Sequence, residues 1–109
     1  MPKADVKTTS TVSDEYKEQA QQLFRNIAKG VDKDDKYSTE MKKVAAARGF
    51  ELGAYMTKAI DALQFEPKQK HELLAQTVIL RRMALPDYQT VGVFLQMLRY
   101  ARTSQDAAS

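Results

Sequence analysis

The residues of this chain that could carry out chemistry are few and stand apart from one another. There is no cysteine, so disulfides, thiolate metal sites and cysteine nucleophiles are excluded. The one histidine, His71, would need an orienting carboxylate and a substrate within reach to act as a general base, and the adjacent Glu72 points to a different side of a helix. No glycine-rich phosphate loop is present. We therefore expect a protein that is not an enzyme and that holds no cofactor.

Three clustered aspartates invite comparison with a calcium-binding loop. Counted from Asp32, the sixth position of such a loop is Tyr37 rather than glycine, and the twelfth is Lys43 rather than glutamate. The segment "VDKDDKYS" therefore predicts a charged connector exposed to solvent and no metal site. Ser38 or Thr39 can cap a helix that follows it.

Basic residues slightly outnumber acidic ones, 17 to 14, which gives a net charge of +3 and a pI near 9.2. This balance is compatible with nucleic-acid binding but does not require it. Guanidinium groups match phosphate oxygens, and the same side chains also serve as solvated edges that cover apolar surface. Both readings apply to Arg81, Arg82, Arg99 and Arg102.

Helices must position these side chains, because apolar residues recur at helical spacing almost throughout. Ser13 followed by Asp14 and Glu15 predicts a helix start, since a hydroxyl cap and early carboxylates suit the positive end of the helix dipole. Gly30 is a natural place for this helix to end. Its buried face is expected to comprise Tyr16, Ala20, Leu23, Ile27 and Val31, with Phe24 and Ala28 widening it.

Prolines mark the boundaries of the later helices. Pro67 suits the first turn of one helix, and Pro86 stops it. Asp87 can cap a last helix that ends near Arg102. No alternating strand pattern and no internal repeat is visible. We predict an all-α fold, a compact four- to five-helix bundle over residues 13–102, with a flexible arm over 1–12 and a flexible tail over 103–109.

The stretch "KKVAAARGFELGAYMTKAIDAL" has two readings. As one long helix, it places Gly49 and Gly53 beside an apolar stripe, where they let another helix approach closely. Alternatively, the chain turns at Gly49 in a left-handed cap, Phe50 packs back, and a new helix starts near Gly53. Helix propensity supports both.

In the second reading, Val44–Leu63 resembles the two-helix part of ribbon-helix-helix DNA-binding proteins, over about a fifth of the chain. The resemblance implies a dimer in which a short strand ahead of the first helix pairs with its twin and reads bases in the major groove. It also implies that backbone amides at the second helix start, near Gly53, contact a phosphate. The family's pattern is filled here by Val44, Ala45, Gly49, Phe50, Gly53, Tyr55, Met56, Ala59 and Ile60.

Two functions are open for a protein of this kind. The first is a helical adaptor or regulatory protein that binds a protein partner through an exposed apolar helix surface. The second is a dimeric DNA-binding regulator whose basic helical face contacts phosphates. We expect the adaptor surface to contain Leu80, Met83, Phe94 and Met97, and the DNA-binding face to contain Lys42, Lys43, Arg48 and Lys58.

We also expect a homodimer in the cytoplasm. The core of so short a chain is marginal, and wide apolar sectors on the last two helices would be stabilised by a second copy. The N-terminal residues lack the apolar stretch that is typical of a signal peptide. No segment approaches the roughly 20 consecutive apolar residues that are needed to cross a bilayer.

Overall fold

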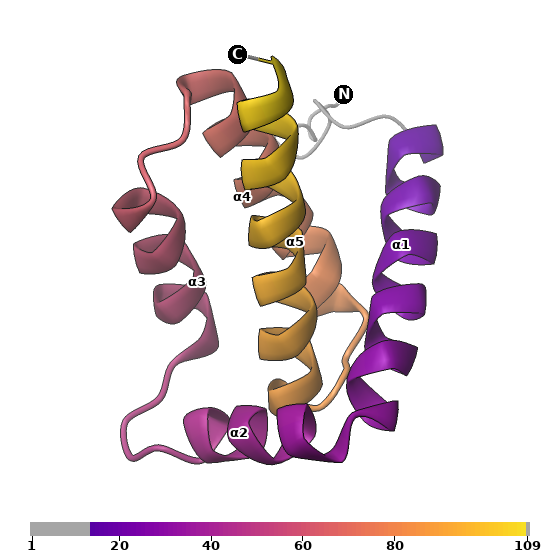
Figure 1. Cartoon of the computed structure of the whole chain (residues 1–109), viewed down its shortest axis with the longest axis vertical. Coiled ribbons are helices and arrows are strands. Elements are labelled where there is room, and N and C mark those ends of the chain that lie inside the picture. The colour runs from indigo at the N-terminus through magenta and orange to yellow at the C-terminus, as the bar shows by residue number, and fades with distance from the viewer. Residues whose placement is uncertain (1–13, 109) are drawn as a thin grey trace, which may run out of the picture.

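The computed structural model describes residues 14–108, with side chains through Thr103. Five helices follow one another along the chain (Figure 1). They are α1 (Asp14–Lys33), α2 (Asp35–Ala45), α3 (Leu52–Ala62), α4 (Pro67–Arg82) and α5 (Asp87–Ala108). The predicted all-α bundle is thus confirmed. The predicted arm over 1–12 and the predicted cap Ser13 lie outside the described residues.

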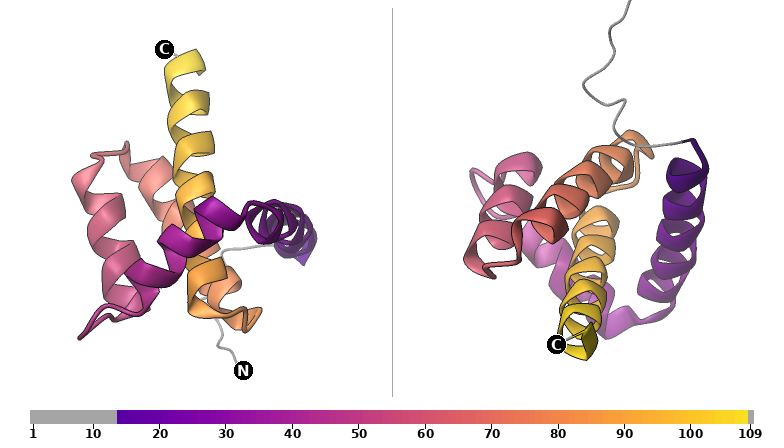
Figure 2. Two further views of the ribbon diagram at one scale, coloured as in Figure 1. Left: turned by 60° about the horizontal axis from the view of Figure 1, so that its bottom comes forward. Right: turned by 90° about the horizontal axis from the view of Figure 1, so that it is seen from above.

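The last helix, α5, is the centre of the fold and contacts each of the other four. In Figure 1, α1 and α3 stand on either side of α5, α4 lies behind it, and α2 crosses its base. Figure 2 shows the same crossing of α2 over α5 from a second direction. The largest side chains at the centre of the core are Phe24, Phe94, Met56, Ile60, Leu73 and Leu80, which come from four helices.

The first two helices are separated by one residue, Asp34, rather than by the predicted connector. Its backbone is extended, and its carboxylate accepts a hydrogen bond from the backbone N–H of Tyr37, which caps α2. The Ser38 hydroxyl donates to the backbone carbonyl of Val31 and so satisfies the end of α1. The prediction that the first helix ends at Gly30 was therefore wrong, because Asp34 supplies a better boundary four residues later.

The chain turns at Gly49, as the second of the two readings predicted. Helix α2 ends at Ala45, and Gly49 has a φ of +77°, in the left-handed region that favours glycine. Phe50 packs back, with its ring centroid 5.5 Å from that of Tyr55. Helix α3 starts at Leu52 behind Glu51, whose side chain makes no capping hydrogen bond.

The resemblance to ribbon-helix-helix proteins did not hold. The family requires a strand ahead of the first helix, and in this structure α1 and Asp34 occupy that place. None of the residues over 14–108 is in a strand. The two helices and the turn between them therefore belong to an ordinary helical bundle.

The boundaries marked by proline lie within a few residues of their predicted places. Pro67 is in the first turn of α4. Helix α4 ends at Arg82, and the chain reverses through Ala84, whose φ is +57°. Helix α5 then continues to Ala108, past the predicted end at Arg102, so the predicted tail is helical along most of its length. Over residues 14–108 no helix combines the length and apolar character needed to cross a membrane.

Candidate protein-binding surface

The residues predicted to form an exposed partner-binding surface lie mainly inside the protein. Leu80 and Phe94 are fully buried, and only 2% of Met97 is exposed, whereas Met83 is half-buried. The apolar sectors of α4 and α5 look wide in the sequence because α4 and α5 pack against each other and against α1 and α3. The prediction that these four residues form an exposed surface was therefore wrong.

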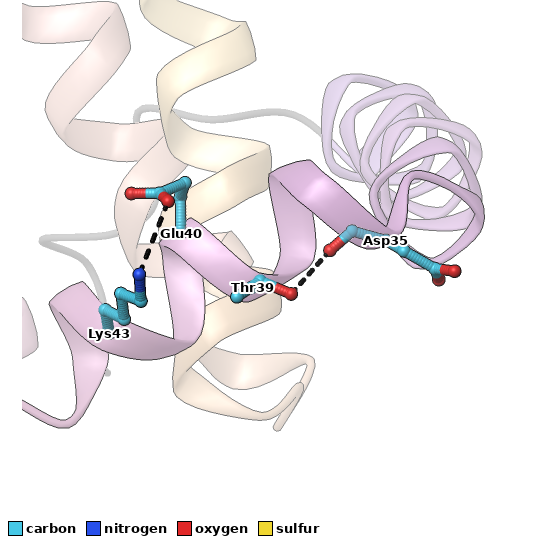
Figure 3. A network of polar contacts seen from close by, with 4 residues as sticks. All are labelled: Asp35, Thr39, Glu40 and Lys43. Carbon is cyan, nitrogen blue, oxygen red and sulfur yellow. Dashed lines mark hydrogen bonds and ion pairs between the residues drawn. The ribbon is translucent and has the colours of Figure 1, made fainter.

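The residues predicted to contact DNA remain exposed around the α2–α3 connection. The Lys42 ammonium lies 5.0 Å from the ring centroid of Tyr88. Lys43 Nζ is 3.7 Å from a Glu40 carboxylate oxygen, in an exposed pair that contributes little to stability (Figure 3). In the same helix, the Thr39 hydroxyl donates to the backbone carbonyl of Asp35 (Figure 3). Arg48 lies in the turn.

Lys58 is exposed further along α3, on the second helix of this pair. Arg81, one of the arginines that the sequence also offered for phosphate contacts, lies close to this face. The Arg81 guanidinium lies against the start of α3, where its Nη1 would be 3.2 Å from a Cβ placed on Gly53. Lys42, Lys43, Arg48 and Arg81 therefore gather near the α2–α3 connection, while Glu40 and Glu51 offset part of their charge.

An apolar hollow opens between α1, α4 and α5. It has a volume of about 230 Å³ and is lined by Leu23, Gln69, Glu72, Leu73, Gln76, Met97, Tyr100 and Ala101. Leu23 is 38% exposed and Tyr100 is 68% exposed. Only three large hydrophobic side chains in the described part of the chain are this exposed, and two of them line this one hollow.

A second, polar hollow lies further along α1, where α2 joins α1 and α5. Its volume is about 450 Å³, and it is lined by Ile27, Gly30, Val31, Asp34, Tyr37, Gln96 and Arg99. The Tyr37 hydroxyl donates to the backbone carbonyl of Gly92, at 3.2 Å, which holds the ring against α5. Asp34 and Arg99 bring opposite charges to this hollow, and no ion pair joins them.

Both hollows lie on the same side of α1. Leu23, Ile27, Gly30 and Asp34 are spaced by four, three and four residues, which is the spacing of one helix face. Helices α1 and α5 run antiparallel, since Val31 packs at Gly92 and Leu23 shares its hollow with Tyr100. Ile27 is then level with Gln96, and both line the polar hollow.

Gly30 is the one glycine of α1, and nothing in the fold requires it. A Cβ placed there would meet no atom within 4 Å, and its φ is ordinary for a helix. Glycine inside a helix costs about 0.5–1 kcal/mol relative to alanine. The bare backbone at Gly30 therefore leaves the wall of the polar hollow open to a close approach by another molecule.

Helix α1 is tied to α4 beside the apolar hollow by a hydrogen bond from the Gln76 amide to the Tyr16 hydroxyl. Burial raises the pKa of the Tyr16 hydroxyl, the bond from Gln76 acts in the opposite direction, and the nearby charge of Glu72 raises the pKa further. The lining residue Gln76 thus also holds α1 in place.

The described residues include no group of three or more side chains that could hold a metal ion, and His71 is exposed on α4. The two hollows along α1 are the candidate site. No family model, curated protein or solved structure matches this chain.

Sequence reasoning missed this surface because it assigned Leu23 and Ile27 to the buried face of α1. In the structure, Ala20, Phe24, Ala28 and Val31 are the buried residues of α1, as expected, whereas Leu23 is exposed and Ile27 is half-buried at the edge of this face. The two glutamines directly before Leu23 and the glycine at position 30 were signals of an exposed flank, but both also suit an ordinary amphipathic helix.

Proposed function

We propose that this protein is a protein-binding module and that the apolar hollow receives a side chain of its partner. The observation that carries the proposal is the placement of Leu23 and Tyr100, two exposed hydrophobic residues from different helices, around one hollow. Partners bind chiefly through a few apolar anchors that fill such hollows. This assigns the adaptor function to α1 and α5 rather than to the buried residues first expected.

The size of the apolar hollow supports a side chain as its occupant. Pockets for drug-sized ligands typically measure about 300–1,000 Å³ and enclose most of the ligand. At about 230 Å³ this hollow is smaller, and it is open to solvent at Leu23 and Tyr100. Gln69 and Gln76 provide amides beside the apolar lining, which suits a peptide backbone or polar side chain next to the anchor.

The test is a selection of binders from a display library of random peptides presented to the full chain. Selected peptides are then titrated by fluorescence polarisation against Leu23→Ser, Tyr100→Ser and Val78→Ser. Val78 is 38% exposed, as Leu23 is, but lines neither hollow, so it is the matched control. We expect the first two variants to weaken binding about tenfold, a loss of about 1.4 kcal/mol, and Val78→Ser to leave it unchanged.

Failure to select any binder, or binders that tolerate both Leu23→Ser and Tyr100→Ser, would contradict the proposal. The homodimer expected from the sequence is tested with the same variants by sedimentation at rising concentration. A dimer that Leu23→Ser dissociates and Val78→Ser does not would show that a second copy fills the hollow. That result would replace the separate partner proposed here.

A second candidate function is DNA binding at the α2–α3 connection. It is favoured by Arg81, which joins Lys42, Lys43 and Arg48 there although it comes from a different helix. Binding of this kind depends on phosphate contacts and weakens steeply with salt. A polarisation titration with random duplex DNA at low and near-physiological salt tests it. We expect Arg48→Glu to abolish any salt-sensitive binding, and no binding at low salt would exclude this function.

A further inference from the structure

Resting on the proposed function, we infer that the partner presents an amphipathic helix, which lies along the Leu23–Asp34 side of α1. An apolar anchor of this helix fills the apolar hollow, and an acidic side chain about one turn from the anchor meets Arg99. The helix passes closest to α1 at Gly30. This inference names the kind of partner, whereas the proposed function requires only a side chain in the hollow.

The side of α1 that carries both hollows is long enough for a helix to pack along it. From Leu23 to Asp34 it advances eleven residues, which is about 16 Å or three turns. Along this length α1 offers Leu23, Ile27 and Gly30 toward the hollows, and Asp34 follows directly after the helix end. An amphipathic helix presents its anchors at the same spacing, so the two helices can pack along all three turns.

Gly30 lies two turns from Leu23 and has no side chain to separate the backbones. Helices approach one another most closely where small residues face each other. A partner helix with a small residue opposite Gly30 could contact the backbone of α1 there. It would also cover the exposed parts of Ile27. The absence of any atom within 4 Å of a Cβ at Gly30 shows that this space is free for such a neighbour.

The charges of the polar hollow specify the polar residues of the partner. Arg99 makes no ion pair or side-chain hydrogen bond within the part of the chain that the structure describes. Arg99 precedes Tyr100, which lies level with Leu23 at the hollow that receives the anchor. An acidic residue of the partner helix about four positions from the anchor is therefore within reach of Arg99. Asp34, eleven positions from Leu23, favours a basic residue at the far end of the partner helix.

The experiment uses the peptides selected against the full chain and two further variants. Gly30→Leu fills the free space on α1, and Arg99→Glu reverses the charge. We expect selected peptides to share an apolar residue and an acidic residue about four positions away. We expect Gly30→Leu to weaken their binding about tenfold without lowering thermal stability, because a Cβ there meets no atom within 4 Å and leucine replaces a poor helix former.

Charge reversal distinguishes a direct contact from a general loss of structure. Arg99→Glu should weaken binding about fivefold, and changing the peptide's acidic residue to lysine should restore affinity for this variant only. Circular dichroism of the bound peptide should show helix.

The outcomes separate the two proposals. If Leu23→Ser abolishes binding while Gly30→Leu and Arg99→Glu leave it unchanged, the inference of a partner helix along α1 is wrong, and the proposed function as a protein-binding module is retained. Selected peptides that bind in an extended conformation would overturn the inference of a partner helix in the same way. If Leu23→Ser has no effect, both proposals fail.

Discussion

Two helical glycines, Gly30 and Gly92, have different structural roles because their surroundings differ. Gly30 and Gly92 both lie inside helices with ordinary φ angles. A Cβ at Gly92 would lie 3.0 Å from Cγ2 of Val31 and 3.2 Å from Cε2 of Tyr37, whereas a Cβ at Gly30 would contact nothing. Gly92 therefore permits α5 to pack against α1 and α2, and Gly30 opens the polar hollow.

The same substitution should consequently have opposite effects at these two positions. Gly30→Ala should raise the free energy of unfolding by about 0.5–1 kcal/mol, because it only improves helix propensity. Gly92→Ala should lower it by about 1–3 kcal/mol, because the buried Val31 and the half-buried Tyr37 must shift. Urea denaturation followed by circular dichroism measures both. Stabilisation by Gly92→Ala would show that the contact between α1 and α5 relaxes freely.

At the scale of elements, the ends of helices are as informative as their faces. The start at Pro67 was predictable, since proline suits the first turn of a helix, whereas the turn at Gly49 was one of two readings that the sequence left open. The boundary at Asp34 was not, because it lies among three aspartates that could each cap a helix and follows a glycine that looked like an end.

The candidate site was less predictable than the helices. Spacing indicates that Leu80, Phe94 and Met97 lie on apolar faces, but it does not tell which apolar face meets another helix and which meets solvent. In α1, whether Leu23 meets the core or solvent depends on how the helix is rotated about its axis. This rotation results from contacts between elements far apart in the sequence. Leu23 and Tyr100, separated by most of the chain, could be brought together only by the fold.

Two partly buried tyrosines, Tyr16 of α1 and Tyr55 of α3, predict a dependence of stability on pH. Burial raises the pKa of Tyr16, and burial also raises that of Tyr55. Below about pH 10 both hydroxyls keep their protons in folded and unfolded chains alike, so stability is unaffected. Above this pH the unfolded chain loses these protons first, and the free energy of unfolding should fall as pH rises through the folded pKa values.

Urea denaturation between pH 9 and pH 11 (values chosen on either side of the tyrosine pKa, roughly 10) measures this dependence. Tyr16→Phe combined with Tyr55→Phe removes both titrating groups and should flatten it. An equally steep decline in the double variant would assign the effect to other groups.

At the scale of the whole molecule, the two functional candidates use different parts of one bundle. The hollows lie along α1 and α5, whereas the cations that could meet DNA surround the connection between α2 and α3. The central position of α5 links these regions, because it contacts all four other helices. A partner on α1 and a ligand at α2–α3 would therefore be held by the same rigid core.

The single extended residue at Asp34 has a consequence for the integrity of the monomer. With helical dihedral angles at this one position, Asp14–Ala45 would become an unbroken rod of 32 residues, about 48 Å long. Phe24 would leave its place in the core, and the vacated slot would match only the corresponding rod of another molecule. A helical torsion at this one aspartate would therefore let two chains exchange their first helices instead of each folding upon itself.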